Sequence, residues 1–259
     1  MIDVDRIRAI FTEEISGRSG NVMDEAEHQG RIFMRGVIPR TGDVRPDDKV
    51  QAGVALKATP TSISLYPYVF RLVCHNGLIF AHSTESRKLF VEADSIFIEV
   101  NGNLEGVISG TGIEKPLREA VEDCCTAEAF KASTHKFRQS LMMSPLQEVL
   151  HQGNPLTRIL YGSVNKLGTY HKLAKAYLSP IMEEYLAHND EPGMFRMVNA
   201  VTAVAREVRN PALKWNLECM AGEMAMLRNM PMIEPKPYRA DLPNEKAREP
   251  VTSQIAVLS

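Results

Sequence analysis

The chain has 259 residues, of which 44% are hydrophobic and 24% charged, and its formal net charge is −2 at pH 7. This composition is typical of a globular protein with room for one large domain or two small ones. No apolar run approaches the roughly 20 residues needed to cross a bilayer, and the N-terminal segment lacks the apolar stretch of a signal peptide. These features argue against a membrane-spanning helix, and we expect a cytoplasmic protein without membrane contact.

Charge is unevenly distributed along the chain. Residues 1–130 carry 14 basic and 20 acidic side chains, whereas residues 131–180 carry seven basic side chains and one acidic side chain. A basic segment can face an anionic partner such as a nucleic acid, or it can be a solvated helix surface that balances acidic neighbours. The sequence leaves both interpretations open. The seven basic residues are Lys131, Lys136, Arg138, Arg158, Lys166, Lys172 and Lys175.

The cysteines and histidines predict no metal site. Cys74, Cys124, Cys125 and Cys219 form no Cys-x-x-Cys pair, and we expect reduced, mostly buried thiols. The seven histidines show none of the spacings that hold zinc. We therefore expect neither a metal nor another cofactor.

Residues 3–15 predict a short helix, and the polar stretch 16–30 that follows predicts a loop. From about residue 30 to 112 the β-branched and aromatic content rises, and Gly, Pro and Asn separate short segments. This pattern is typical of an antiparallel sheet. The candidate strands are residues 31–38, 50–58, 62–74, 78–83 and 95–100.

The stretch PYVFRLVCHNGLIF, residues 67–80, raises the question of a Cys–His active site. Asn76-Gly77 between two β-rich runs predicts a hairpin with a type I′ turn, which would place Arg71 opposite His82. Neighbouring strand residues point to opposite faces, so the side chains of Cys74 and His75 would diverge. We therefore predict that Cys74 is a core thiol and not a nucleophile.

Aromatic residues alternate along the preceding strand, where Tyr66, Tyr68 and Phe70 share one face. Such a row can stack unpaired bases, or it can be part of the core. Both interpretations are kept at this point.

Residues 116–141 fit a single helix with Pro116 near its first turn. The stripe at Phe130, Thr134, Phe137 and Leu141 is expected to pack, while other positions give the same helix a basic side. That basic side carries Lys131, His135 and Arg138.

The C-terminal half is predicted to be mainly helical. Apolar residues recur at helical spacing in 193–209 and again in 212–228, with Pro211 between them, so a packed helical hairpin is expected. Arg196, Asn199 and Arg206 are expected on its surface. Residues 230–259, rich in proline and without periodicity, predict an extended or disordered tail.

Two segments, RLVCHNGLIF and MVNAVTAVAREVRNPALKWNLECMAGEM, resemble a phage/plasmid-like family classed as a domain of unknown function. The family has an Arg-x-x-Cys-x-Asn-Gly hairpin, an Asn-x-x-Thr helix and a Leu-Glu-x-x-x-Gly helix. The resemblance covers residues 30–228 but rests on these two short islands. It implies an accessory role in a mobile element and supplies no established activity. The matching positions are Arg71, Cys74, Asn76, Gly77, Asn199, Thr202, Glu218 and Gly222.

Together these patterns predict an α+β protein. A single domain, residues 1–229, would place a mainly antiparallel sheet (30–112) under a helical region (114–229), followed by the tail 230–259.

The predicted function is non-enzymatic binding of nucleic acid, preferably single-stranded DNA, with annealing or protection of the strand. Tyr66 or Tyr68 would lie near the basic residues that contact the strand. A homo-oligomer is compatible with such a role. The alternative is a protein-interaction module that binds a host or phage protein through the Met-rich helices or the tail. The residues expected to contact nucleic acid are Arg71, Lys131, His135, Arg138, Lys166, Lys172 and Lys175.

Overall fold

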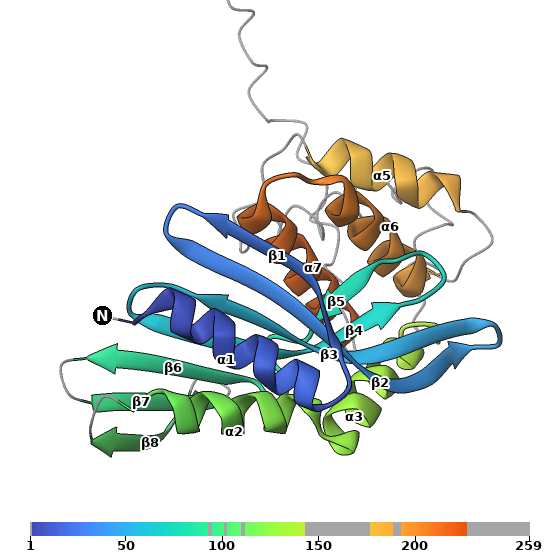
Figure 1. Ribbon diagram of the computed structural model, residues 1–259. Coiled ribbons are helices and arrows are strands. Elements are labelled where there is room, and N and C mark those ends of the chain that lie inside the picture. Colours follow the sequence, from blue (N-terminus) through green and yellow to red (C-terminus); the bar gives the residue numbers. More distant parts are fainter. Residues whose placement is uncertain are drawn as a thin grey trace, which may run out of the picture.

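The computed structural model describes residues 2–92, 95–100, 103–109, 112–142, 177–188 and 193–226 (Figure 1). One helix precedes the strands, and the other described helices follow them. The strands are β1 (Asn21–His28), β2 (Arg31–Arg45), β3 (Asp48–Ala58), β4 (Ser62–Arg71), β5 (Gly77–Ile79), β6 (Arg87–Glu92), β7 (Ser95–Val100) and β8 (Asn103–Ser109). The helices are α1 (Val4–Gly17), α2 (Glu114–Cys125), α3 (Ala127–Gln139), α5 (Leu178–Ala187), α6 (Gly193–Glu207) and α7 (Pro211–Met226).

The strands form one antiparallel sheet of eight, in the order β1-β2-β3-β4-β6-β7-β8, with β5 paired to β4 outside this path. Two strands share one edge of β4: residues 62–65 pair with β6, and residues 68–70 pair with β5. Because nearly every strand neighbours the next one in sequence, the connections are short. An N-terminal antiparallel sheet followed by helices confirms the predicted α+β class.

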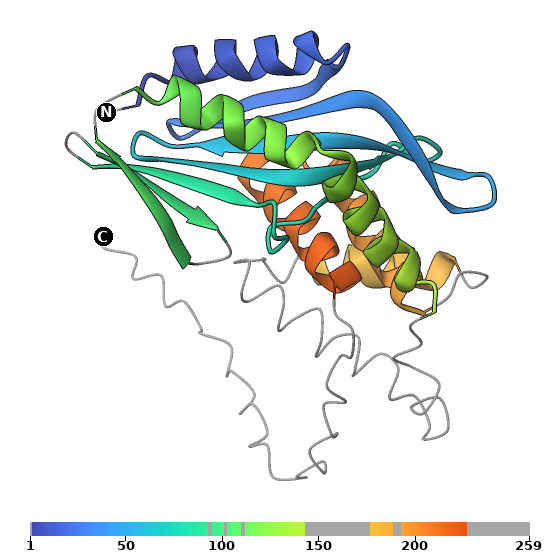
Figure 2. The same cartoon turned by 90° about the horizontal axis from the view of Figure 1, so that it is seen from below.

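Helices cover both faces of this sheet (Figures 1 and 2). On one face α1 and α2 contribute to the larger core cluster, for example through Ile7 and Leu117. On the other face Trp215 of α7 packs against Phe33 and Tyr66, with ring centroids 5.8 Å away in both cases. Strands in the middle of the sheet are therefore buried on both sides, which explains their continuous apolar runs.

Helix α1 confirms the predicted N-terminal helix. The Asp3 carboxylate accepts hydrogen bonds from the backbone N–H groups of Asp5 and Arg6, both at 3.1 Å, and so caps its first turn. Ile7, Ile10 and Phe11 share the buried side at helical spacing.

The predicted loop at 16–30 is wrong, because β1 occupies Asn21–His28. This strand lies at the edge of the sheet and alternates between exposed and half-buried positions; apart from Met23 its exposed residues are polar. Strands β6 and β8 were likewise not predicted.

The single helix predicted at 116–141 is two helices. Thr126 separates α2 from α3 with an extended backbone, φ −61° and ψ 157°, and its hydroxyl accepts a hydrogen bond from the Ala129 N–H at 3.1 Å. A threonine that caps the next helix ends the preceding one.

The β4–β5 hairpin exists, but its predicted turn is wrong. Phe70 pairs with Gly77 and Tyr68 with Ile79, so residues 72–76 form a longer loop and Arg71, the last residue of β4, does not face His82. The positive φ in this loop, 56°, belongs to His75. The Arg71 N–H closes the loop on the Asn76 carbonyl at 2.8 Å.

Helices α6 and α7 confirm the predicted helical hairpin. The Asn210 side chain accepts hydrogen bonds from the N–H groups of Ala212 and Leu213, at 3.0 and 3.1 Å, and Pro211 is the first helical residue. The expected surface positions of Arg196 and Asn199 are wrong, because both side chains are buried; Arg206 is exposed. The predicted tail 230–259 lies outside the described residues.

Candidate functional site

The two segments that carry the resemblance stated above meet in space, where the β4–β5 loop and β5 contact α6 and α7. We call this region the motif junction. It comprises Arg71, Cys74, Asn76, Gly77, Asn199, Thr202, Glu218 and Gly222.

Arg71 is the centre of the motif junction. Its guanidinium forms a bidentate pair with the Asp48 carboxylate, Nε to Oδ1 at 3.0 Å and Nη2 to Oδ2 at 2.5 Å. Its Nη1 donates to Asn199 Oδ1 at 2.5 Å, and the ring of Phe195 lies 5.2 Å away. Because Arg71 is only 5% exposed and these groups occupy it, the prediction that it contacts phosphate is wrong.

A second buried pair lies on the α7 side of the sheet. Arg35 of β2 donates from Nε to Glu218 Oε2 at 2.6 Å and from Nη1 to Asp24 Oδ2 at 2.9 Å. Burial raises the pKa of the Glu218 carboxyl, and the adjacent Arg35 cation opposes that rise. Lys214 also donates to Asp24, at 2.7 Å, so cations and carboxylates alternate across this site.

Glycines set the closeness of packing in the motif junction. A Cβ on Gly222 would lie 2.0 Å from the carbonyl oxygen of Ile79, and a Cβ on Gly77 would lie 1.9 Å from the Tyr68 hydroxyl. Gly77 is therefore needed because the Tyr68 side chain leaves no room for a Cβ. It is not needed for a positive φ, since the residue with positive φ in this loop is His75. Helix α7 can approach β5 this closely only through a residue without a side chain.

The remaining motif residues also make structural contacts. The Thr202 hydroxyl donates to the Asn199 carbonyl at 3.0 Å, and Arg206 donates to the Cys74 carbonyl at 2.9 Å. The prediction of a core thiol is wrong for Cys74, which is half-buried, lies in the loop after β4 and belongs to neither core cluster; burial still raises the pKa of its thiol. A neutral thiol is a poor nucleophile, which agrees with the non-catalytic interpretation.

The tyrosines that were considered as base-stacking residues are buried. Tyr66 and Tyr68 are 7% and 4% exposed and belong to the core cluster around Trp215. The stacking interpretation is therefore wrong and the core interpretation is confirmed, because α7 covers this face of the sheet.

Three of the predicted cationic contacts lie together on α3. Lys131, His135 and Arg138 are all exposed, while Phe130 and Phe137 on the opposite side of the helix are buried. We call these three residues the α3 row. The Arg138 guanidinium donates to the Asp43 carbonyl, and the part of the chain that the structure describes provides no partner for Lys131 or His135. Lys166, Lys172 and Lys175 lie outside the described residues.

Sequence reasoning missed Asp24, Arg35 and Asp48, which complete the two buried pairs. Arg35 was visible as the one cation within the apolar run IFMRGVI, residues 32–38, a sign of a buried charge that needs a partner. Nothing in the sequence connected Arg35 with Glu218, 183 positions further on.

Within the described ranges, no three His, Cys, Asp or Glu side chains are grouped so that they could hold a metal ion. None of the described helices combines the length and apolarity needed to span a membrane. Comparisons with protein-family models, with curated proteins and with solved structures found no match.

Proposed function

We propose that the protein is a non-enzymatic binding protein that holds a nucleic-acid strand, preferably single-stranded DNA, along the α3 row and anneals or protects it. The single observation that carries this proposal is the exposure of three cationic or titratable side chains on one side of a helix whose other side is fixed in the core. A mobile-element origin and a homo-oligomeric state belong to the same proposal.

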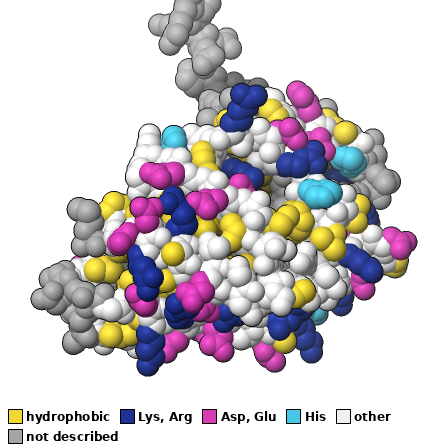
Figure 3. Space-filling view, viewed as in Figure 1, with side chains coloured by type: hydrophobic (Ala, Val, Ile, Leu, Met, Phe, Trp, Pro, Cys, Tyr) yellow, Lys and Arg dark blue, Asp and Glu magenta, His cyan; other side chains and the backbone are white. Residues whose placement is uncertain are grey.

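The spacing and anchoring of the α3 row suit phosphate contact. Positions i, i+4 and i+7 lie on one side of a helix, and cations along a line can neutralise successive phosphates. Arg138 is held by the Asp43 carbonyl on the β2–β3 hairpin, which fixes the orientation of its guanidinium. By contrast, the face that carries α1 mixes Lys and Arg with Asp and Glu and offers no continuous basic region (Figure 3).

Fluorescence anisotropy with labelled single- and double-stranded oligonucleotides, at low and at physiological salt, tests the proposal. We expect saturable binding that salt weakens and that favours single strands. The triple variant Lys131→Gln/His135→Gln/Arg138→Gln should bind at least about tenfold more weakly at low salt. It should also reduce the slope of log affinity against log salt, by about 0.7 for each phosphate that is no longer neutralised.

The matched control is Arg6→Gln/Arg31→Gln/Lys115→Gln, which removes three exposed basic side chains distributed over α1, β2 and α2. It should retain nearly the affinity of the unmodified protein. Equal losses in the two triple variants, or no saturable binding by the unmodified protein, would contradict the proposal.

The alternative, a protein-interaction module, gains support from a different surface. Phe90, Phe97 and Val107 are cross-strand neighbours on one face of β6–β8, and Leu104 lies on the same face beyond a bulge. Leu104 and Val107 are 63% and 52% exposed, and none of these four side chains belongs to a core cluster. An exposed apolar group of this kind marks contact surfaces.

The Met-rich helices named for this alternative do not provide such a surface. Met194, Met197, Met220 and Met224 are all at most 2% exposed. A photo-crosslinking residue at position 104 should therefore capture a partner that the same residue at position 115 does not. The partner, once purified, should bind a Leu104→Lys/Val107→Lys variant at least about tenfold more weakly than the unmodified protein. Equal capture at both positions would contradict this alternative.

A further inference from the structure

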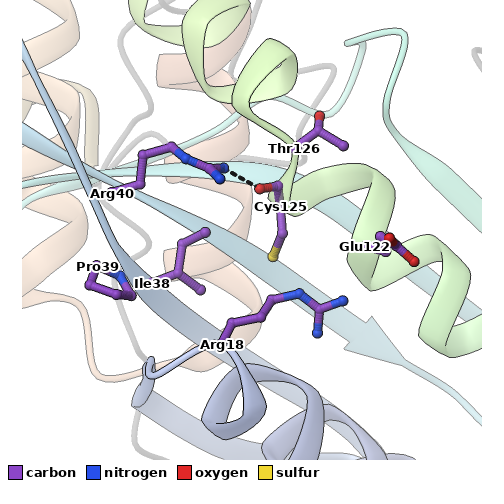
Figure 4. Close-up of a pocket in the computed structure, with 7 residues that line it drawn as sticks. All are labelled: Arg18, Ile38, Pro39, Arg40, Glu122, Cys125 and Thr126. Atoms are coloured by element: carbon purple, nitrogen blue, oxygen red, sulfur yellow. Dashed lines mark hydrogen bonds between the residues drawn. The ribbon is translucent and has the colours of Figure 1, made fainter.

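A cavity of about 360 Å³ lies where the end of α1, strand β2 and the break between α2 and α3 meet. It is separate from both the motif junction and the α3 row. Its volume is within the range of small-molecule sites. The lining residues are Arg18, Ile38, Pro39, Arg40, Glu122, Cys125 and Thr126, and we call this cavity the Arg18–Arg40 pocket (Figure 4).

Two guanidinium groups enter this pocket from different elements. Figure 4 shows Arg40, from β2, and Arg18, from the end of α1, on two sides of the Cys125 side chain. The Nη1 group of Arg40 donates to the Cys125 carbonyl, and Nη1 of Arg18 donates to the Glu14 carbonyl at 2.8 Å and to its carboxylate at 2.5 Å. These bonds hold both side chains in place.

Most of the donors of the two arginines remain available. A guanidinium has five N–H donors, and only the Nη1 groups are bound here within the described ranges. Thr126, which also lines the pocket, is both the C-cap of α2 and the N-cap of α3, so the opposite dipoles of the two helix ends offset each other there and the two arginines supply the positive charge.

The charges around the pocket leave it attractive to an anion. Glu14 offsets Arg18 in part but is shared with Arg118, whose Nη1 also binds it. Glu122 is an exposed carboxylate at the rim and opposes an incoming anion. The Cys125 thiol stays neutral, because burial raises its pKa to about 11.

We propose that the Arg18–Arg40 pocket binds a small oxyanion-bearing ligand, with a phosphate or a carboxylate group bound by the guanidinium groups that line it. Arg40 presents its free edge for a bidentate contact, and Arg18 supplies the second cation. Ile38 and Pro39 offer an apolar wall for the rest of the ligand. This inference does not depend on nucleic-acid binding by the α3 row.

Isothermal titration with inorganic phosphate, and in a second arm with acetate, tests the pocket at constant ionic strength against a sodium chloride blank. We expect saturable binding of phosphate. The variants Arg18→Gln and Arg40→Gln should each weaken it at least about tenfold. Arg6→Gln, which removes an exposed arginine of the same helix α1, should change it less than about twofold.

The variant Glu122→Gln separates a ligand site from a purely structural role. Glu122 is exposed and without a partner in the described ranges, so its neutralisation should leave folding intact and tighten phosphate binding by about twofold to fivefold. The proposal is overturned if phosphate shows no saturation above the chloride blank, or if Glu122→Gln fails to strengthen binding. It is also overturned if correctly folded Arg18→Gln binds as the unmodified protein does.

Oligonucleotide titration of the Arg18→Gln protein identifies the source of the oxyanion. Unchanged strand affinity, together with abolished phosphate binding, assigns the pocket to a free small anion. A parallel loss of strand affinity assigns it to a phosphate of the strand backbone. The α3 row variant should retain full phosphate binding in the pocket, so failure of the proposed function is distinguishable from failure of this inference.

Discussion

The motif junction and the α3 row use the same residue types for opposite purposes. In the motif junction, Arg71 is buried and its donors are met by Asp48 and Asn199. On α3, Lys131 and His135 are exposed and have no partner in the described ranges. A buried charge must be paired, whereas a solvated charge is free to meet a ligand.

The contrast shows that the most distinctive sequence motif, the residues of the motif junction, has a structural role: these residues hold β4 and β5 against α6 and α7. The Arg-x-x-Cys-x-Asn-Gly segment has the composition of a reactive site, yet its side chains and backbone connect β4–β5 to α6 and α7. The residues proposed to bind a ligand, those of the α3 row, are by contrast ordinary exposed side chains. Substitutions in the motif junction should therefore change stability, and substitutions in the α3 row should change binding.

Removal of Arg71 should give the largest effect on stability. The variant Arg71→Met leaves the Asp48 carboxylate buried, and within the described part of the chain the cation that remains beside it is Arg45 at 3.5 Å. Breaking a buried pair in this way costs about 3–5 kcal/mol of the free energy of unfolding. Urea unfolding followed by circular dichroism measures the loss.

The control for Arg71→Met is Lys88→Met, which breaks the partly exposed pair with Glu99 and should cost less than about 1 kcal/mol. The double variant Asp48→Asn/Arg71→Met should lose less than the sum of its single variants, because neither charge is then left alone. Similar losses in Arg71→Met and Lys88→Met would show that burial does not distinguish the two sites.

Gly222→Ala should have the next largest effect. The new Cβ would lie 2.0 Å from the Ile79 carbonyl oxygen, so α7 must move away from β5. Overpacking of this kind costs about 1–3 kcal/mol. Gly17→Ala, also helical and with nothing within 4 Å of the new Cβ, is the matched control and should be neutral or stabilising. Thermal unfolding of the two proteins decides between a packing contact and a general effect of alanine.

Much of the fold could be predicted, because apolar periodicity records which residues are buried. It predicted α1, the strands that include Ile32, Val54 and Leu65, and the α6–α7 hairpin. Periodicity failed for β1, since an edge strand buries only part of its surface and carries Asp24, Glu25 and Glu27 outside the core. It also missed the break at Thr126, because the apolar stripe continues across the capping residue.

The candidate site was harder to predict. The alternation of residues along a strand tells which face of the sheet a side chain is on, but not which helix covers that face. Arg71 was expected to point toward an anion, but Asn199 of α6 and Phe137 of α3 close over it. The sequence likewise did not show that α7 covers Tyr68, so base stacking by Tyr68 was kept as an interpretation. By contrast, Lys131 and Arg138 were placed correctly on the exposed side of their helix, since helical spacing alone separates the two sides.

The smallest effect is expected at His82, an exposed side chain whose partner Glu223 is largely buried, with 54% and 12% of the two side chains exposed. Its Nε2 is 2.7 Å from Glu223 on α7, and this hydrogen bond raises the pKa of the imidazole, although partial burial and Lys88 oppose the rise. A raised pKa means that the folded state holds the proton more tightly than the unfolded state. The stabilisation is therefore complete below about pH 6.5 and is lost as the pH rises through the folded-state pKa.

Urea unfolding of the unmodified protein and of His82→Gln at pH 5.5 and pH 8.5 measures this contribution. The difference in unfolding free energy should be larger at pH 5.5 and should remain under about 1 kcal/mol, because the pair is half-exposed and screened by solvent. In a Glu223→Gln background the same His82→Gln change should lose most of its pH dependence, since the charge that raises the pKa is gone. If the pH dependence persists in that background, a group other than Glu223 stabilises the protonated His82. The His82–Glu223 hydrogen bond would then not be the source of the pH dependence.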